Sequence, residues 1–219
     1  MNVVCWWLFV DRMRPQANNE QQTTMNYLAH AYLSFNDPDI LTGNMINDYV
    51  RGKKKFDYTA GVQKGMILHR AIDNFTDEHP ATKNAKEFFK ADYRLYAGAF
   101  VDVVFDHFLA KDENEFADNQ ALQSFAENTY ALVETRLDIL PEAFQKMFPY
   151  MKEQNWLYNY QFDTLIKKSF AGLEKRAVYL SETARAFELF KEHYDNLQTC
   201  YEEFFPHLKA FTIHQLITL

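Results

Sequence analysis

The sequence predicts an all-α protein, a single compact multi-helix domain, on three observations. Only 6 Gly and 6 Pro occur among 219 residues, so few positions would interrupt a long helix. Amphipathic and apolar stretches of helical length follow one another, and runs of β-branched residues at a period of two are absent. Hydrophobic residues make up 47% of the chain, which is enough apolar material for the core of one domain.

Helix breakers divide the first part of the chain into short helices. The breakers are Asn36-Asp37-Pro38, Gly52 and Glu78-His79-Pro80. Proline and glycine end a helix, and proline is also accepted in the first turn of the next one. The predicted helices cover residues 25–35, 40–50, 59–75 and 81–90.

The segment 93–111 is the most apolar of the predicted helices. Its apolar residues leave little polar face, and they include Val101, Val103, Val104, Phe105, Phe108 and Leu109. A helix that is apolar all round belongs at the centre of a fold. A long amphipathic helix follows over residues 119–140 and ends at Pro141. The remaining predicted helices cover residues 142–154, 160–180 and 183–205, with one more short helix or a frayed end at 207–219.

Residues 1–24 differ from the patterned sequence that begins at Met25. The apolar run at residues 3–10 is too short to span a bilayer, and no basic region precedes it as in a signal peptide. We expect an extension, disordered or produced by an upstream start site, outside a helical domain of residues 25–219. A short membrane-surface anchor is the alternative, and no membrane span is predicted.

Charge, cysteine content and missing motifs exclude several classes of protein. The net charge of −7 argues against general binding to nucleic acid. Cys5 and Cys200 form no CxxC motif and no disulfide framework, which favours the cytoplasm. No Glu-x-x-His precedes any histidine, which excludes the di-iron bundle and HExxH signatures. Nucleophile-elbow, Walker and dinucleotide glycine motifs are also absent.

Two carboxylates lie within the most apolar segment. Asp102 and Asp106 are four residues apart and therefore share one helix face. Burying two neighbouring carboxylates is costly unless a positive charge lies beside them. A buried Arg or Lys is one explanation and a metal ion is the other. His107 favours the metal, because imidazole and carboxylate together suit divalent first-row ions. We predict Asp102, Asp106 and His107 as metal ligands.

A second helix face carries His69, Asp73 and Asp77 at the same spacing of four. One such His–Asp pair is commonly a surface hydrogen bond. Two faces with this composition within 40 residues favour a metal site, with His69 and Asp73 as ligands. Asp77 is a candidate for the carboxylate that activates a water molecule. Arg70 can hold a phosphate oxygen, unless it only forms a surface salt bridge.

A basic loop stands out in this acidic chain. It consists of Arg51, Lys53, Lys54 and Lys55 around Gly52. A solvated run of charge is the usual explanation. The functional alternative is a docking site for an acidic protein or a phosphate-bearing substrate.

Several motifs resemble the acyl carrier protein phosphodiesterases, also called ACP hydrolyases. The most specific is His69-Arg70-x-Ile72-Asp73-x-Phe75-Thr76-Asp77-x-His79-Pro80. The others are Met25-Asn26-Tyr27-Leu28-Ala29-His30, Gly43-Asn44, Asp48, Arg51-Gly52, Asp102-x-x-x-Asp106-His107-Phe108-Leu109, Trp156-Leu157 with Tyr160, and Phe204-Phe205-Pro206. The resemblance covers residues 25–206 and is dense up to about residue 110.

The resemblance implies a fold distantly similar to the HD-type metal-dependent phosphohydrolases. It implies hydrolysis of the phosphodiester that joins 4′-phosphopantetheine to a serine of holo-acyl carrier protein, with manganese, magnesium or ferrous iron as cofactor. It adds His30 to the metal ligands and Asp48 to the catalytic carboxylates. Local sequence alone would make them a core histidine and a solvated residue. It also implies that the acidic carrier protein is the partner of the Arg51–Lys55 loop.

Two other functions stay open at this point. One is a different HD-type phosphohydrolase that acts on a nucleotide or another phosphodiester. The other is a non-enzymatic helical module in which the aspartates and histidines form buried ion pairs. The sequence makes no prediction of oligomeric state.

Overall fold

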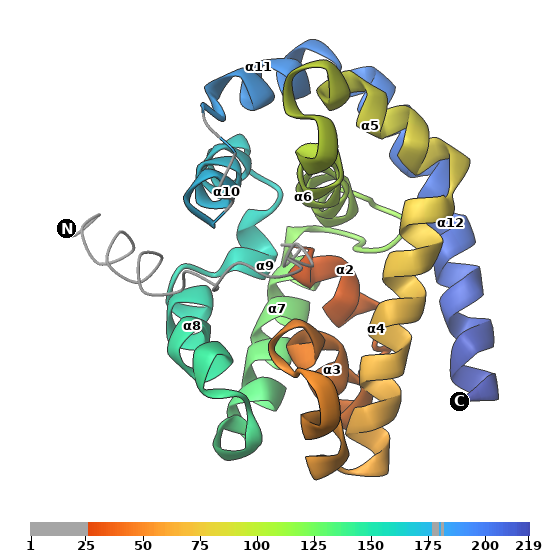
Figure 1. The fold of residues 1–219 in the computed structure, drawn as a ribbon, viewed down its shortest axis with the longest axis vertical. Coiled ribbons are helices and arrows are strands. Elements are labelled where there is room, and N and C mark those ends of the chain that lie inside the picture. The colour runs from red at the N-terminus through yellow and green to blue at the C-terminus, as the bar shows by residue number, and fades with distance from the viewer. Residues whose placement is uncertain (1–25, 177–179, 181) are drawn as a thin grey trace.

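The computed structural model describes residues 26–176, 180 and 182–219, so the predicted extension at residues 1–24 lies outside the described residues. Every regular element in the described ranges is a helix, and the predicted all-α class is confirmed. Figure 1 shows α6 (Ala97–Ala110) inside a ring of other helices and α12 (Tyr194–Thr218) along one side. No helix of this part of the chain is long and apolar enough to cross a membrane.

The other α-helices follow the predicted order. Those before α6 are α2 (Tyr27–Tyr32), α3 (Pro38–Ile46), α4 (Ala60–Glu78) and α5 (Pro80–Tyr93). Those after it are α7 (Asn119–Glu134), α8 (Glu142–Glu153), α9 (Trp156–Asn159), α10 (Asp163–Arg176) and α11 (Ala184–Glu192). Short 3-10 helices connect them: η1 (Asn47–Tyr49), η2 (Gly52–Asp57), η3 (Arg94–Tyr96) and η4 (Leu137–Ile139).

Three predictions of local structure are wrong, one about the type of an element and two about where helices end. The predicted basic loop is the 3-10 helix η2. The predicted helix 119–140 ends at Glu134, and η4 follows it. The predicted helix 183–205 breaks at His193, and α12 then continues through Pro206. Buried side chains on both sides of Pro206, such as Phe205 and Leu208, keep α12 helical by packing.

The predicted central position of the apolar helix is confirmed. All residues of α6 are buried except Gly98 and Asp102. The helix contacts α2, α5, α10 and α12, so both of its sides are covered. Its polar residues must therefore find their partners inside the protein.

Two glycines bring α3 and α4 into backbone contact. A Cβ atom on Gly43 would lie 2.0 Å from the backbone oxygen of Val62, and one on Gly65 would lie 2.3 Å from that of Ile40. Any larger residue would hold the helices apart. This close crossing places Asn44 of α3 against His69 of α4.

Candidate metal site

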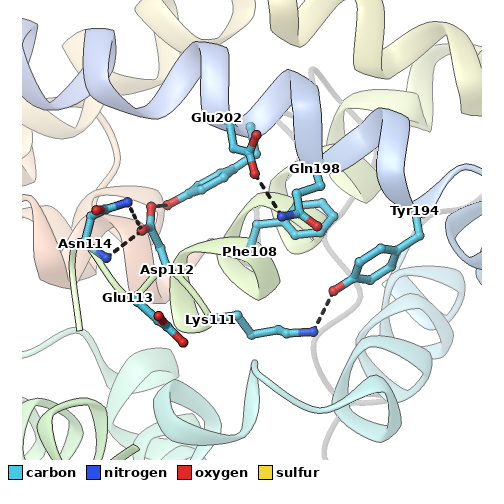
Figure 2. A pocket seen from close by; sticks show the side chains of 9 residues that line it. Phe108, Lys111, Asp112, Glu113, Asn114, Tyr194, Gln198 and Glu202 are labelled. Atoms are coloured by element: carbon cyan, nitrogen blue, oxygen red, sulfur yellow. Dashed lines mark hydrogen bonds between the residues drawn. The ribbon is translucent and has the colours of Figure 1, made fainter. Parts of the chain in front are cut away.

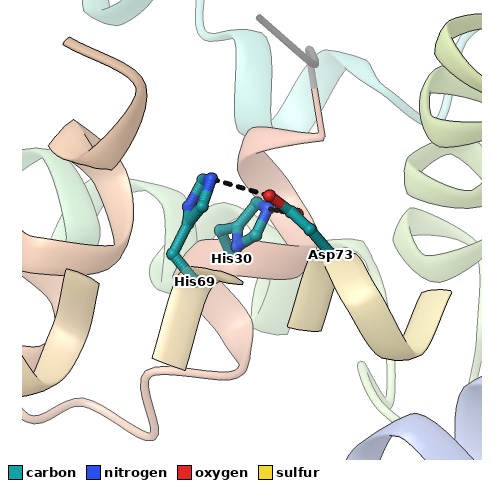
Figure 3. Close-up of side chains that lie close together, drawn as sticks. All are labelled: His30, His69 and Asp73. Carbon is teal, nitrogen blue, oxygen red and sulfur yellow. Dashed lines mark ion pairs between the residues drawn. The ribbon is translucent and has the colours of Figure 1, made fainter. Parts of the chain in front are cut away.

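Three side chains from two helices converge on one point. His30 comes from α2, and His69 and Asp73 come from successive turns of α4. Each offers a ligand atom, and the three atoms lie within 4.8 Å of one another. The imidazole rings stack with centroids 4.0 Å apart. Their Nε2 atoms lie 3.3 Å and 3.1 Å from the two carboxylate oxygens of Asp73 (Figure 3).

Asn44 contacts both histidines on the side away from Asp73. Its Oδ1 lies 2.7 Å from Nδ1 of His30, and its backbone oxygen lies 2.7 Å from Nδ1 of His69. The Asn44 side-chain amide donates to the backbone oxygen of His30 and to Oγ of Ser34, which fixes which atom is the oxygen. Both Nδ1 atoms face acceptors and therefore carry a proton, so the Nε2 atoms of the neutral rings keep a lone pair.

This arrangement fits a divalent metal ion. Nε2 of His30 is buried and has no hydrogen-bond partner among the described residues, although it lies beside Asp73. The Nε2 lone pairs of the two histidines face the negatively charged carboxylate of Asp73. This contact is unfavourable unless a positive charge lies between them. Imidazole and carboxylate ligands suit first-row divalent ions, and hydrogen bonds from the opposite ring nitrogens are typical of metal-binding histidines.

A proton takes this position on His69 when no metal is bound. Burial lowers the pKa of His69, but hydrogen bonds to Asp48 and Asp73 outweigh burial and raise it to about 10. Burial raises the pKa of Asp73, but the two neighbouring histidines hold it well below its usual range. Metal binding must therefore displace a proton from His69.

Asp48 extends the group toward solvent. It lies in η1, and its Oδ1 is 3.1 Å from Nε2 of His69. The side chains of Asp48 and Asp73 are 22% and 34% exposed, whereas those of the two histidines are nearly inaccessible. The carboxylates therefore mark the side from which a substrate can reach the site.

Asp106 lies outside this group of three and supports it indirectly. Its two carboxylate oxygens accept hydrogen bonds from the backbone N–H groups of Leu28 and Ala29, at 2.9 Å and 2.8 Å. These are N–H groups of the first turn of α2, where Asn26 provides no side-chain cap. Burial raises the pKa of Asp106 to about 8, although these hydrogen bonds lower it. Asp106 thus anchors the short helix that carries His30.

His107 faces a different part of the interior. Its Nδ1 lies 2.8 Å from the backbone oxygen of Tyr160, and its Nε2 lies 3.1 Å from the hydroxyl of Tyr194. Lys111 also reaches that hydroxyl, at the wall of a cavity of about 380 Å³ (Figure 2). Both ring nitrogens are therefore occupied by protein groups, and the structure does not bring His107 to Asp73.

The remaining predicted residues lie around the group. Asp102 is partly buried, and burial raises its pKa, with further contributions from Asp73 and Asp77. Asp77 forms an exposed ion pair with Lys86 at 2.6 Å. Arg70 is exposed on α4. Arg51, which precedes η2, is exposed, as are Lys53 and Lys54 within η2, whereas Lys55 is partly buried.

The comparisons with known proteins point to one family. The chain matches the family described as acyl carrier protein phosphodiesterase over residues 25–208. The chain belongs to this family. Relatives named acyl carrier protein phosphodiesterase include that of Photorhabdus laumondii subsp. laumondii, which is 31% identical over 184 residues, 84% of this chain and 93% of that protein. That of Yersinia pestis is 31% identical over 193 residues, 88% of this chain and the whole of that protein.

Membership in the acyl carrier protein phosphodiesterase family confirms the resemblance predicted from the sequence motifs. No solved structure matches the chain, so the distant similarity to HD-type phosphohydrolases stays a prediction.

Sequence reasoning assigned no role to Asn44. In the sequence this residue points to function only through the Gly43-Asn44 motif of the family resemblance. The available signal was a polar amide inside the apolar segment 40–46, all of which is buried in α3. Such an amide needs internal partners, and here they are the two histidines.

Proposed function

We propose that this chain hydrolyses the phosphodiester between 4′-phosphopantetheine and serine in holo-acyl carrier protein. The reaction uses a divalent metal ion, with manganese as the first candidate, and His30, His69 and Asp73 hold this ion. The convergence of these three side chains, with both Nδ1 atoms bonded to Asn44, is the observation that carries the proposal. The family supplies the substrate class, because its curated relatives are named for it.

The roles of the residues follow from their positions. A divalent ion supplies Lewis-acid stabilisation of the phosphoryl oxygens and a water nucleophile at neutral pH. Asp48, beside His69 and partly exposed, orients that water and accepts its proton. Asp77, the other predicted carboxylate, pairs with Lys86 and is the weaker candidate for this role. Arg70, exposed next to His69, steadies a non-bridging phosphate oxygen.

The experiment follows conversion of holo- to apo-carrier protein by mass spectrometry. We expect the activity to disappear after thorough chelation and to return when manganese is added. Asp73→Asn should also abolish it, because the amide offers a neutral and weaker ligand. Asp138→Asn is the matched control, since Asp138 is exposed in η4 and should tolerate the same change. Full turnover in chelator would contradict the metal mechanism.

The same experiment separates the two other functions. Metal-dependent cleavage of nucleotides without conversion of the carrier protein would favour a different phosphohydrolase. A folded protein that binds no manganese would favour buried ion pairs alone, in which His69 stays protonated between Asp48 and Asp73.

We also propose that η2 docks the acidic carrier protein through Arg51, Lys53, Lys54 and Lys55. Arg51 lies three residues after Asp48, so these exposed cations are close in sequence to the site. Reversing the charge of Lys53 and Lys54 to Glu should raise KM more than it lowers kcat, because the loss affects binding and not chemistry. An unchanged KM would contradict docking at η2.

A further inference from the structure

A second cationic surface lies at the other end of α4. A cavity of about 500 Å³ opens where the end of α4 meets α5 and the start of α6. Four cations line it, Lys83, Lys86, Lys90 and Arg94. Lys83, Lys86 and Lys90 are spaced three and four residues apart and share one face of α5, and Arg94 follows directly after that helix. Among the described residues that line the same cavity, two are carboxylates, Asp77 and Glu87, which leaves an excess of positive charge.

The ion pairs at this cavity leave two cations available. Lys86 pairs with Asp77, and Lys90 pairs with Glu87. Lys83 and Arg94 are exposed and have no ion pair among the described residues. In a chain with a net charge of −7, this local excess of cations suits an anionic partner.

An apolar side chain stands beside these cations. Leu95, which also lines the cavity, is 88% exposed. The preceding Arg94 has φ of +45°, an uncommon conformation for a residue other than glycine. An exposed apolar residue within a cationic rim suits a protein surface that carries both acidic and apolar side chains.

This cavity adjoins the candidate metal site. Asp77 lines it and lies one helical turn beyond Asp73 on α4. Asp102 on α6 interacts electrostatically with Asp73, Asp77 and Lys86, so the metal site and the cavity lie close to the same buried carboxyl group. A protein seated on the cavity would therefore lie next to the carboxylate end of the metal site.

We infer that the surface formed by Lys83, Lys86, Lys90, Arg94 and Leu95 docks the acidic face of the carrier protein. This inference rests on the proposed function. Together with η2 it places cations on both sides of the metal site, one group after Asp48 and one after Asp77. Two contacts on opposite sides orient the carrier protein and direct its phosphodiester between them, which neither contact does alone.

The test uses Lys83→Glu/Arg94→Glu, because neither residue belongs to an ion pair of the described structure. We expect KM for holo-carrier protein to rise about tenfold and kcat to stay within about twofold, since rim charges act on encounter and binding. The dissociation constant for apo-carrier protein should rise to the same extent, with a weaker salt dependence than in the wild type.

Lys167→Glu/Lys168→Glu is the matched control, since it makes the same charge change on the exposed face of α10. Its KM should stay near the wild-type value. If the reversal variant does not fold, Lys83→Ala/Arg94→Ala gives the same comparison with a smaller expected rise in KM.

Unchanged KM and unchanged binding of apo-carrier protein in a folded variant would overturn the inference. Loss of a wild-type dimer in the variant, with carrier binding unaffected, would also overturn it and assign the surface to self-association. A wild-type protein that does not convert holo-carrier protein at all would contradict the proposed function instead, and binding of apo-carrier protein still tests the docking surface.

Discussion

Asn44 is the residue on which the geometry of the two histidines depends. Replacing it with alanine removes the acceptor for Nδ1 of His30 and two donors inside the core. We expect Asn44→Ala to weaken manganese binding about 10- to 100-fold, as changes to partners of metal ligands do. Unsatisfied buried groups should also cost about 1–3 kcal/mol of stability. Isothermal titration and urea unfolding measure the two effects.

Ser34→Ala is the control for this prediction. It removes a hydrogen bond to the Asn44 amide but leaves both histidine contacts in place. Its effect on metal affinity should be small. Equal losses of affinity in the two variants would mean that Asn44 acts only through core packing.

His107 predicts a specific pH dependence of stability. Burial lowers its pKa from 6.5 to about 4, and repulsion from Lys111 adds to this, while a hydrogen bond to Tyr160 opposes it. The unfolded chain therefore binds a proton below pH 6.5 that the folded protein does not, so stability falls as the pH decreases. Between pH 7 and pH 5 this loss amounts to about 2 kcal/mol.

The measurement compares urea unfolding of the wild type and His107→Gln at these two pH values, both without metal. The variant should lose about 2 kcal/mol less than the wild type on acidification, because glutamine does not titrate. His69, with a pKa of about 10 in the metal-free protein, stays protonated throughout. The same pH dependence in both proteins would mean that His107 is not held neutral.

At the residue scale, spacing predicted which side chains share a face but not what that face meets. His69 and Asp73 meet His30. Asp106 meets the backbone of α2, and His107 meets Tyr160 and Tyr194, because α6 is covered on both sides. A carboxylate in an apolar helix thus has a third source of compensation besides cations and metals, namely free N–H groups at a helix start.

At the element scale, the crossing of α3 and α4 is the contact that assembles the site. In Gly43→Ala the new Cβ would meet the backbone of Val62, which cannot move aside without separating the helices. We expect a loss of about 1–3 kcal/mol in stability from overpacking, together with weaker metal binding, because Asn44 moves away from His69. Thermal unfolding and metal titration measure both.

Gly98→Ala is the control for this change. The added Cβ would lie 3.3 Å from Cε of Lys86, the far part of a flexible side chain. Stability should change little or increase, since alanine favours the helix. A similar loss in both variants would contradict the special role of the α3–α4 crossing.

Helix order was predictable from the sequence because the breakers and the apolar pattern are local signals. The breaks inside the long predicted helices could not be predicted in this way. α12 passes through Pro206 because tertiary packing outweighs the local cost of proline, and the preceding helix stops at His193 without a breaker. The close crossing of α3 and α4 also depends on two glycines far apart in sequence, which no local pattern relates.

At the scale of the whole molecule, the central apolar helix α6 connects the candidate metal site with the cationic cavity. Asp106 on one side of α6 supports α2, and through it His30, while Asp102 interacts with residues of both the metal site and the cationic cavity. The fold thus places the candidate metal site between two groups of cations, although the chain as a whole is acidic.

We propose that His30, His69 and Asp73 hold the metal ion on which this acyl carrier protein phosphodiesterase depends. The most direct measurement is an anomalous difference map from crystals grown with manganese. We expect a peak bonded to Nε2 of His30, Nε2 of His69 and a carboxylate oxygen of Asp73, and no such peak in Asp73→Asn crystals. A peak at Asp106 and His107, or no peak between the two stacked histidines, would contradict the account.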